Sequence, residues 1–333
     1  MSAHHNHSHD EEVGVKIPAT VIGGFLGAGK TTMVNHILSE SADRRTDVVV
    51  REYGAVAVDD KLIDLAKDRI HIFPGVTMHQ DPQLVLYDFL IGLVHDKSSG
   101  FDNLVLEASG LDTAEGLVQL FFLYKLRSLY RLGSYITVID AEYGHLNLDE
   151  YRVAREQVAC ADVIVMNKID LASEDAQSNL VSKIRQINPV AQIYPTTYCQ
   201  VELAKVLDVS QFDQLRWMLD QPREEEEVNG LSDISSIVLT ERRAMDKEKV
   251  NTWIAKLFST QGTKILRGKG FLYFAGDDSD YRFEFQSVRK SFHSKADSLW
   301  KPGETRETVI VLIGEGLGDA GDIQDSFSEC VAG

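Results

Sequence analysis

The sequence predicts an α/β protein in which a domain with a mostly parallel sheet precedes a smaller α+β domain. Through the first two thirds of the 333 residues, short apolar runs rich in β-branched residues alternate with helical patterns. Such alternation is typical of parallel strands wrapped by helices. A charged segment, 221–232, then interrupts the pattern, and we expect it to be an acidic linker between the two domains.

The expected elements follow in order along the chain. Strands of the first domain are predicted at 19–22, 47–50, 103–107, 135–140, 163–166 and 192–195, with helices at 29–39 and 113–131. The second domain is predicted to contain strands at 235–239, 271–274, 281–286 and 308–313 and a helix at 247–258. The chain therefore divides into a flexible histidine-rich tail at 1–14, a first domain at 15–220, the linker, and a second domain at 233–330.

Composition limits the classes of partner. The formal charge of −17, from 34 Lys and Arg against 51 Asp and Glu, repels polyanions and leaves no obvious face for nucleic acid. The apolar stretches are strand-sized and the first residues lack a secretory signal, so we expect a cytoplasmic protein without a membrane partner. Cys160, Cys199 and Cys330 are too far apart for a disulfide framework or a close-spaced zinc motif, and we expect them to be buried.

Residues Gly24 to Thr31 have the spacing of a complete phosphate-binding loop, and they lie between the strand at 19–22 and the helix at 29–39. Closely spaced glycines let consecutive backbone N–H groups turn toward phosphate oxygens, while Lys30 reaches the β- and γ-phosphates and Thr31 holds Mg²⁺. The positive end of the helix dipole faces the same anion. The alternative, a glycine-rich turn without a ligand, would leave Lys30 without a partner at the start of a helix. The first domain is therefore predicted to be a P-loop NTPase domain.

A second motif predicts the base. The strand at 163–166 leads into Asn167, Lys168 and Asp170, the pattern in which an aspartate accepts hydrogen bonds from N1 and N2 of guanine. Adenine lacks that pair of donors, so binding ATP would bury a carboxylate without partners. Alone, this pattern is also compatible with a helix cap followed by an aspartate. Downstream of a phosphate-binding loop, it favours GTP over ATP and disfavours an ATP-dependent kinase.

The strand at 103–107 ends on a carboxylate, Glu107, with Gly110 three residues later. We expect Glu107 to bind the Mg²⁺ shell or to orient the attacking water, and the backbone N–H of Gly110 to reach the γ-phosphate. The alternative is an ordinary turn in which Ser109 caps a helix. The three motifs together predict catalytic roles for Lys30, Glu107 and Gly110, Mg²⁺ ligation by Thr31 and Glu107, and nucleotide contacts by Gly24, Gly27, Ala28, Gly29, Lys30, Thr31, Thr32, Asn167, Lys168 and Asp170.

These motifs, taken in order, resemble those of the CobW-type GTPases. The likeness includes the segments around Glu52 and Asp140, and past the linker the segments 265–271, 285–288 and 311–314 resemble the CobW C-terminal domain, so it covers nearly the full chain. The resemblance implies a GTP-hydrolysing metallochaperone, or an activator of a metal-dependent client enzyme, with roles around zinc, cobalt and iron. It implies bound GTP or GDP with Mg²⁺.

One departure from the family concerns metal binding. Members usually carry a Gly-Cys-x-Cys-Cys motif, whereas the matching stretch here, 73–79, contains no cysteine. The first switch of this chain has Ala55 where the family commonly has a second glutamate. Glu52, Met78 and His79 are candidates for a weaker mixed site, since imidazole and carboxylate suit iron, zinc, nickel or cobalt. The alternative is that His79 is structural.

The N-terminal tail offers a further set of metal ligands. Four imidazoles lie beside three carboxylates at 10–12, and histidine-rich tracts bind divalent metals. The alternative is a residual purification tag, against which Asn6 and Ser8 argue because they interrupt the run. We interpret the tail as a collector of divalent metal of low specificity, with the candidate ligands His4, His5, His7 and His9.

Two functions remain open from the sequence. The first is a GTPase that couples hydrolysis to metal delivery or to maturation of a client metalloenzyme. The second is a GTP-switched interaction protein, a conformational chaperone without its own metal site. In either case turnover should be slow and stimulated by a partner or by formation of a homodimer, because no internal arginine finger is evident. Arg51 is the one suggestive candidate, and a surface salt bridge is the simpler interpretation of it.

Overall fold

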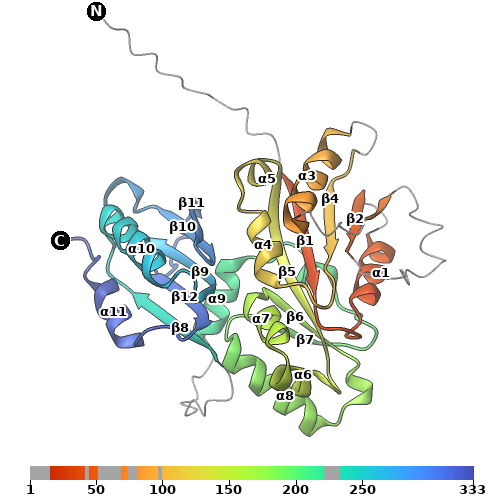
Figure 1. The fold of residues 1–333 in the computed structure, drawn as a ribbon. Helices are drawn as coiled ribbons and strands as arrows, with labels where there is room; N and C mark the ends of the chain where they lie inside the picture. The colour runs from red at the N-terminus through yellow and green to blue at the C-terminus, as the bar shows by residue number, and fades with distance from the viewer. Residues whose placement is uncertain (1–15, 42–44, 52–68, 74–80, 97–99, 221–232) are drawn as a thin grey trace, which may run out of the picture.

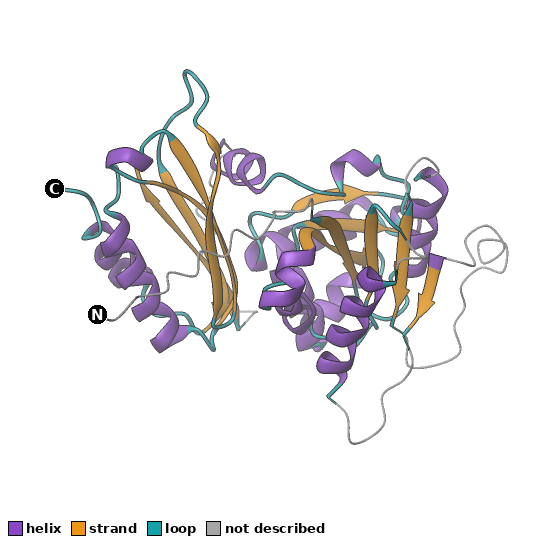
Figure 2. Ribbon diagram, turned by 90° about the horizontal axis from the view of Figure 1, so that it is seen from above, coloured by secondary structure: helices purple, strands orange, loops and turns teal. Residues whose placement is uncertain are grey.

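The computed structural model describes residues 16–41, 45–51, 69–73, 81–96, 100–220 and 233–333. They form two sheets that lie side by side, each with its own helices (Figures 1 and 2). Residues 1–15 and 221–232 lie outside the described part, so the predicted tail and linker boundaries stay predictions. No helix in the described ranges is long and apolar enough to cross a membrane.

The larger sheet contains seven parallel strands in the order β3-β2-β4-β1-β5-β6-β7. Its strands are β1 (Ile17–Gly23), β2 (Thr46–Val50), β3 (Ile70–Ile72), β4 (Asn103–Glu107), β5 (Tyr130–Asp140), β6 (Val163–Asn167) and β7 (Gln192–Pro195). The connecting helices are α1 (Lys30–Glu40), α3 (Pro82–His95), α4 (Ala114–Leu120), α5 (Tyr124–Leu129), α6 (Gly144–Glu150), α7 (Arg152–Cys160), α8 (Glu174–Ile187) and α9 (Gln211–Asp220), with short 3-10 turns at Ile169–Leu171 and Leu203–Lys205.

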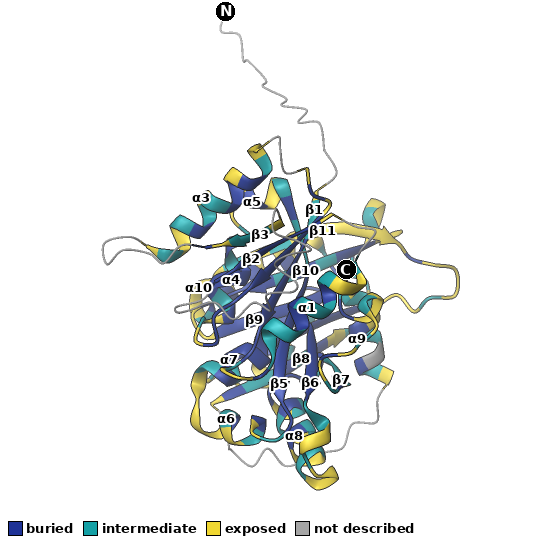
Figure 3. Ribbon diagram, turned by 90° about the vertical axis from the view of Figure 1, so that its right-hand side faces the viewer, coloured by how far each residue is buried: buried dark blue, intermediate teal, exposed yellow. Residues whose placement is uncertain are grey.

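Both faces of this sheet are covered, and its central strands are buried along most of their length (Figure 3). Alternate residues of β2 show the arrangement: Val48 and Val50 pack with Met33 and Ile37 of α1, whereas Val49 belongs to the core beneath α3, α4 and α7. Continuous apolar strands of this kind are expected in parallel sheets with helices on both faces. The predicted parallel α/β domain is confirmed, together with each of its six predicted strands.

The helix predicted at 113–131 is wrong. The chain forms two short helices, α4 and α5, and Tyr130 already belongs to β5, where it pairs with Ile17. The Tyr130 ring is buried, and its hydroxyl donates a hydrogen bond of 2.8 Å to the carbonyl of Leu90. Burial of this ring and the pairing with β1 require an extended chain at 130, so tertiary packing overrides a helical pattern rich in leucine and phenylalanine.

The smaller sheet contains five antiparallel strands in the order β11-β10-β9-β12-β8. Its elements are β8 (Ile234–Glu241), α10 (Lys247–Gln261), β9 (Ile265–Tyr273), a 3-10 turn (Gly276–Asp278), β10 (Tyr281–Val288), β11 (Ser291–Leu299), β12 (Thr308–Glu315) and α11 (Ala320–Ser328). The predicted α+β domain is confirmed, but strand β11 was not predicted. That edge strand is largely exposed and polar, so it lacks the alternation of a half-buried strand.

The two sheets share one continuous core. Helices α10 and α11 cover the outer face of the smaller sheet, and its inner face packs on α4, α7 and α9 (Figure 1). Phe271, Val311 and Ile313 of the smaller sheet join the same apolar cluster as Leu117 of α4 and Val158 of α7. Helix α4 follows the carboxyl end of β4 by a few residues, so the segment after Glu107 leads directly to this interface.

Candidate functional site

The loop between β1 and α1 adopts backbone conformations that require glycine. Gly24 has φ of 138° and Gly29 has φ of 110°, values that other residues rarely adopt. A Cβ atom at Gly24 would lie 2.3 Å from the carbonyl oxygen of Val138, and one at Gly29 would lie 2.4 Å from Nδ2 of Asn167. Gly27 also has positive φ, 74°, but space around it is open. The glycines therefore serve both the turn and the close approach of neighbouring strands.

Internal hydrogen bonds hold the loop in a closed turn. The backbone N–H of Ala28 and the ammonium of Lys30 donate to the same carbonyl, that of Phe25, at 3.3 and 3.4 Å. Helix α1 begins at Lys30, so the amides of its first turn, including those of Thr31 and Thr32, lie at the end of the loop. The first four N–H groups of a helix have no partner within the helix and form an anion site.

Thr31 and Glu107 meet beside the loop. The Thr31 hydroxyl donates a hydrogen bond of 2.8 Å to Oε1 of Glu107, which is the last residue of β4 and is buried. Strand register places Glu107 between Ile22 of β1 and Val50 of β2, at the carboxyl edge of the sheet. A hydroxyl and a carboxylate are hard oxygen donors of the kind Mg²⁺ prefers, so the pair fits the predicted Mg²⁺ site.

The segment after Glu107 packs against the phosphate-binding loop. A Cβ atom at Gly110 would lie 2.9 Å from the backbone nitrogen of Leu26, so only glycine allows this approach. The carboxylate of Asp112 accepts a hydrogen bond of 2.8 Å from the backbone N–H of Ser109. Helix α4 starts after Thr113, so the alternative in which Ser109 caps a helix is wrong.

The predicted base-binding segment is tied to the same loop. Asn167 is buried; its Nδ2 donates to the carbonyl of Ala28 at 3.1 Å, and its Oδ1 accepts from the backbone N–H of Cys199 at 2.9 Å. The Lys168 ammonium donates to the carbonyl of Gly27 at 2.8 Å and to Oδ2 of Asp140 at 2.7 Å. The bonds to Ala28 and Gly27 tie the segment that carries Asp170 to the phosphate-binding loop, and those with Cys199 and Asp140 tie it to the neighbouring strand ends.

Asp170 lies in the 3-10 turn after β6, and its side chain is exposed at the edge of the site. Neighbouring Lys168 has a left-handed backbone, with φ of 61°. This conformation turns the chain between Asn167 and Asp170. Asn167 points inward to the loop and holds the structure together, whereas the Asp170 carboxylate stays accessible to a ligand. The structure thus brings all of the predicted nucleotide residues to one edge of the sheet.

Sequence reasoning missed the loop after β7 as part of this site. Cys199 has a left-handed backbone and is buried, and its thiol lies 3.5 Å from the carbonyl oxygen of Gly29 as a weak donor. Burial raises the pKa of this thiol to about 12, which keeps it neutral. The available signal was position: the loop follows the carboxyl end of a parallel strand, where ligands gather in such folds. All three cysteines are buried and free, as predicted.

Arg51 is not a surface residue. Its side chain is 6% exposed, its guanidinium lies 3.5 Å from the Asp112 carboxylate, and it stacks at 5.6 Å over the ring of Phe73. Burial raises the pKa of Asp112, and the Arg51 charge opposes that rise. The surface salt bridge predicted for Arg51 is therefore wrong: it forms a buried ion pair that holds the segment after Glu107.

The candidate transition-metal ligands lie outside the described residues. This applies to Glu52, Met78 and His79 and to the tail histidines His4, His5, His7 and His9. Within the described ranges, no group of three or more His, Cys, Asp or Glu side chains is arranged to hold a metal ion.

Comparison with known proteins agrees with this geometry. Residues 18–195 match the model of the CobW/HypB/UreG nucleotide-binding domain, and residues 234–331 match the cobalamin synthesis protein CobW C-terminal domain. The chain is 29% identical to the zinc chaperone YjiA of Escherichia coli, over 89% of this chain and 93% of that protein. It is 25% identical to the zinc chaperone CobW of Pseudomonas aeruginosa, over 92% and 89% of the two chains.

A solved structure shares the whole architecture. The crystal structure of Zn(II)-bound YjiA GTPase from Escherichia coli superposes with a TM-score of 0.71 at 27% identity, and the match covers 95% of this chain and 99% of that one. The likeness therefore includes both sheets and their arrangement.

Proposed function

This chain belongs to the family defined by the CobW/HypB/UreG nucleotide-binding domain and the CobW C-terminal domain, and from that premise we propose that it is a slow GTPase that couples its nucleotide state to metal delivery. The observation that carries the proposal is the bond from Asn167 to Ala28, which joins the base-binding segment to the phosphate-binding loop. A triphosphate on the loop then places its base beside Asp170, whose carboxylate matches guanine.

In this proposal each residue has a defined part. Loop amides and Lys30 bind the phosphates, and Gly110 contributes its N–H to the γ-phosphate. Thr31 and Glu107 would hold Mg²⁺, which neutralises charge on the β- and γ-oxygens when bound. Glu107 would also orient the water that attacks the γ-phosphate. Arg51 is already matched by Asp112, so until a partner adds a further charge the rate of hydrolysis depends on Lys30, on positioning and on backbone donors.

A route from this site to the second domain is present in the contacts. Helix α4 begins soon after Gly110; its Glu115 pairs with Arg289 in the turn between β10 and β11, and its Gln119 pairs with Ser291, the first residue of β11. In the proposal, the segment after Glu107 rearranges on hydrolysis and moves α4. This movement changes the surface that the second domain exposes to a client metalloenzyme.

Glu107→Gln is expected to lower the rate of GTP hydrolysis about 100-fold while GTP affinity changes by less than about tenfold. Glutamine keeps an acceptor for Thr31 but loses the negative charge that Mg²⁺ and the attacking water require. Single-turnover hydrolysis and nucleotide titration of the same preparation would measure the two effects. The exposed Glu248→Gln on α10 is the matched control. Wild-type hydrolysis in Glu107→Gln would remove this residue from the chemistry.

We propose that the metal is zinc, because the relatives YjiA and CobW are both named zinc chaperones. The chain has no cysteine between 51 and 107, so carboxylate, imidazole and thioether groups would have to bind the ion. We expect a protein lacking residues 1–12 to bind Zn²⁺ about tenfold more tightly in one nucleotide state than in the other, a usual size for such coupling.

Equilibrium dialysis with Zn²⁺ tests this expectation, with Glu107→Gln holding GTP and wild type holding GDP. Zinc binding that differs between these states supports metal delivery. Zinc binding that is lost with residues 1–12, or that ignores the nucleotide, supports the second candidate, a GTP-switched chaperone without an internal metal site. The lack of cysteine in 73–79 is the observation that favours that candidate.

A further inference from the structure

A cavity of about 130 Å³ lies between the two sheets, far from the nucleotide site. Its wall includes Tyr130, the first residue of β5, and Asp162, which precedes β6, so it opens at the amino edge of the larger sheet. The phosphate-binding loop is at the opposite, carboxyl edge. A single water needs a cavity of roughly 10–15 Å³, so this one has room for a small hydrated ion.

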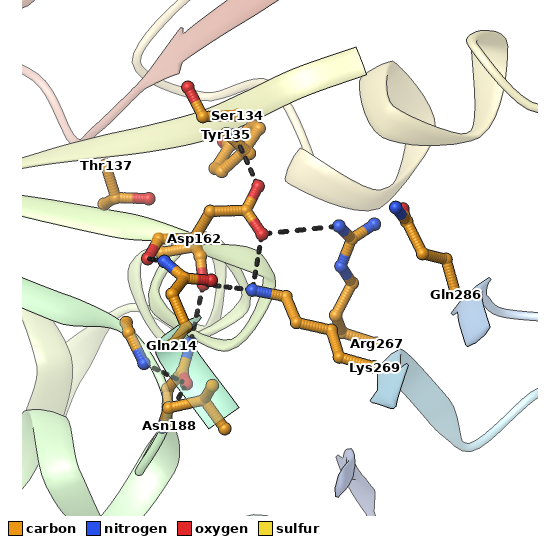
Figure 4. A network of polar contacts seen from close by, with 12 residues as sticks. Ser134, Tyr135, Thr137, Asp162, Asn188, Gln214, Arg267, Lys269 and Gln286 are labelled. Carbon is orange, nitrogen blue, oxygen red and sulfur yellow. Dashed lines mark hydrogen bonds and ion pairs between the residues drawn. The ribbon is translucent and has the colours of Figure 1, made fainter. Parts of the chain in front are cut away.

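One wall of the cavity is a buried guanidinium with unused donors. Arg267 of β9 is 1% exposed, and its Nη2 lies 3.5 Å from Oδ1 of Asp162. Within the described part of the chain, its Nε and Nη1 have no hydrogen-bond partner. Figure 4 shows the side of the guanidinium away from Asp162 facing Gln286, which also lines the cavity. Buried donors without a partner are unfavourable, so the arrangement calls for an acceptor.

The Asp162 carboxylate does not provide enough acceptors to satisfy Arg267. Its Oδ2 already accepts a hydrogen bond of 2.6 Å from the backbone N–H of Tyr135. Its Oδ1, the oxygen that faces Arg267, also forms an ion pair with the buried ammonium of Lys269 (Figure 4). Two buried cations therefore share one carboxylate, which keeps the pKa of Asp162 below its usual value despite its burial. The interface has an excess of positive charge at this point.

The rest of the lining increases that excess. Arg131 is paired with Asp208, and Lys295 is paired with Glu284 at 3.1 Å. Lys16 and Arg127 line the same cavity and form no ion pair with any residue in the described ranges. Burial, followed by the charges of Arg127 and Lys295, lowers the pKa of Lys16. Like charges are thus crowded together in a chain whose net charge is −17.

We propose that this cavity binds a small oxyanion with two negative charges, of the phosphate or dicarboxylate class. The anion would accept hydrogen bonds from the unused nitrogens of Arg267 and would neutralise Lys16 and Arg127. A guanidinium is well suited to this task because it binds phosphate and carboxylate through two parallel hydrogen bonds. Since Arg267 comes from the smaller sheet and the other two cations from the larger domain, the bound anion bridges the domains and stabilises their docking.

Binding of inorganic phosphate, measured by calorimetry at constant ionic strength, tests this inference. Wild type and Lys30→Ala should bind phosphate in the cavity with equal affinity, because Lys30 belongs to the other edge of the sheet. The double variant Lys16→Gln, Arg127→Gln should bind about tenfold more weakly. Both of its residues are exposed at the rim, so folding should be unaffected. Arg267→Met, where it folds, should bind more weakly still.

Sulfate and succinate arms identify the ligand class: binding of all three ions supports a general dianion site, and binding of phosphate and sulfate alone supports a tetrahedral oxyanion. The inference is overturned if wild type takes up none of these ions. It is also overturned if phosphate binding is lost in Lys30→Ala and kept in the double variant, because the phosphate would then lie on the nucleotide loop. Neither result depends on whether the protein hydrolyses GTP.

Discussion

Lys30→Ala is expected to lower kcat/KM for GTP hydrolysis by about 1000-fold, the largest loss from any single change in this protein. The ammonium lies at the start of α1, 3.4 Å from the Phe25 carbonyl that also closes the loop. From that position it can bind the β- and γ-phosphates while charge builds up on the bridging oxygen. Alanine removes the one side-chain cation of the loop and leaves its amides in place.

Phosphate release from Mg²⁺-GTP under single-turnover conditions measures this effect. Lys256→Ala is the matched control, because it removes an exposed lysine on α10 of the smaller domain. Circular dichroism and the unfolding midpoint should be the same for both variants and wild type. Equal hydrolysis by Lys30→Ala and wild type would mean that the loop is not where the triphosphate reacts.

Asp170→Asn is expected to change which base is bound. In the proposed site the wild-type carboxylate would accept hydrogen bonds from N1–H and the exocyclic amine of guanine, and each bond to a charged group contributes about 1.5–3 kcal/mol. The amide can accept only one of them and presents a donor to the other, so GTP affinity should fall about 100-fold or more. Xanthine carries an oxygen in place of that amine, so the same variant should gain affinity for xanthosine triphosphate.

Titration of wild type and of Asp170→Asn with GTP and with xanthosine triphosphate gives the four affinities that this prediction compares. Asp175→Asn, an exposed aspartate in the first turn of α8, is the control that alters charge nearby without altering the base contact. A variant that loses GTP without gaining xanthosine triphosphate would have a damaged site. A variant that keeps full GTP affinity would show that Asp170 does not contact the base.

The parts of this fold that sequence predicts well are those in which local pattern and tertiary packing agree. Strands β4 and β7 have the predicted bounds because continuous apolar runs end at polar or turn-forming residues. The phosphate-binding loop was predictable because its spacing is imposed by the ligand and by close approaches, such as that of Gly29 to Asn167. Glu107 and Asp170 could be proposed from position: Glu107 is the last residue of β4, and Asp170 follows the end of β6, at the carboxyl edge of the sheet.

The parts that sequence missed depend on distant contacts. Nothing local to Tyr130 shows that its hydroxyl will reach Leu90 and turn a helical pattern into a strand. Cys199 belongs to the site through its bond to Asn167, and Arg51 is buried because Asp112 and Phe73 enclose it. Likewise, Arg267 and Lys269 carry the polar pattern of a surface strand but lie at the interface of the two domains, where Asp162 receives them.

Calorimetric titration of the full chain with GTP and with ATP, both with Mg²⁺, is the measurement that bears most directly on the proposed site. We expect one GTP per chain, and ATP bound at least about 100-fold more weakly, because adenine offers the Asp170 carboxylate no matching pair of donors. Failure to take up GTP, or equal affinity for the two nucleotides, would contradict the assignment of this edge of the sheet as a guanine nucleotide site.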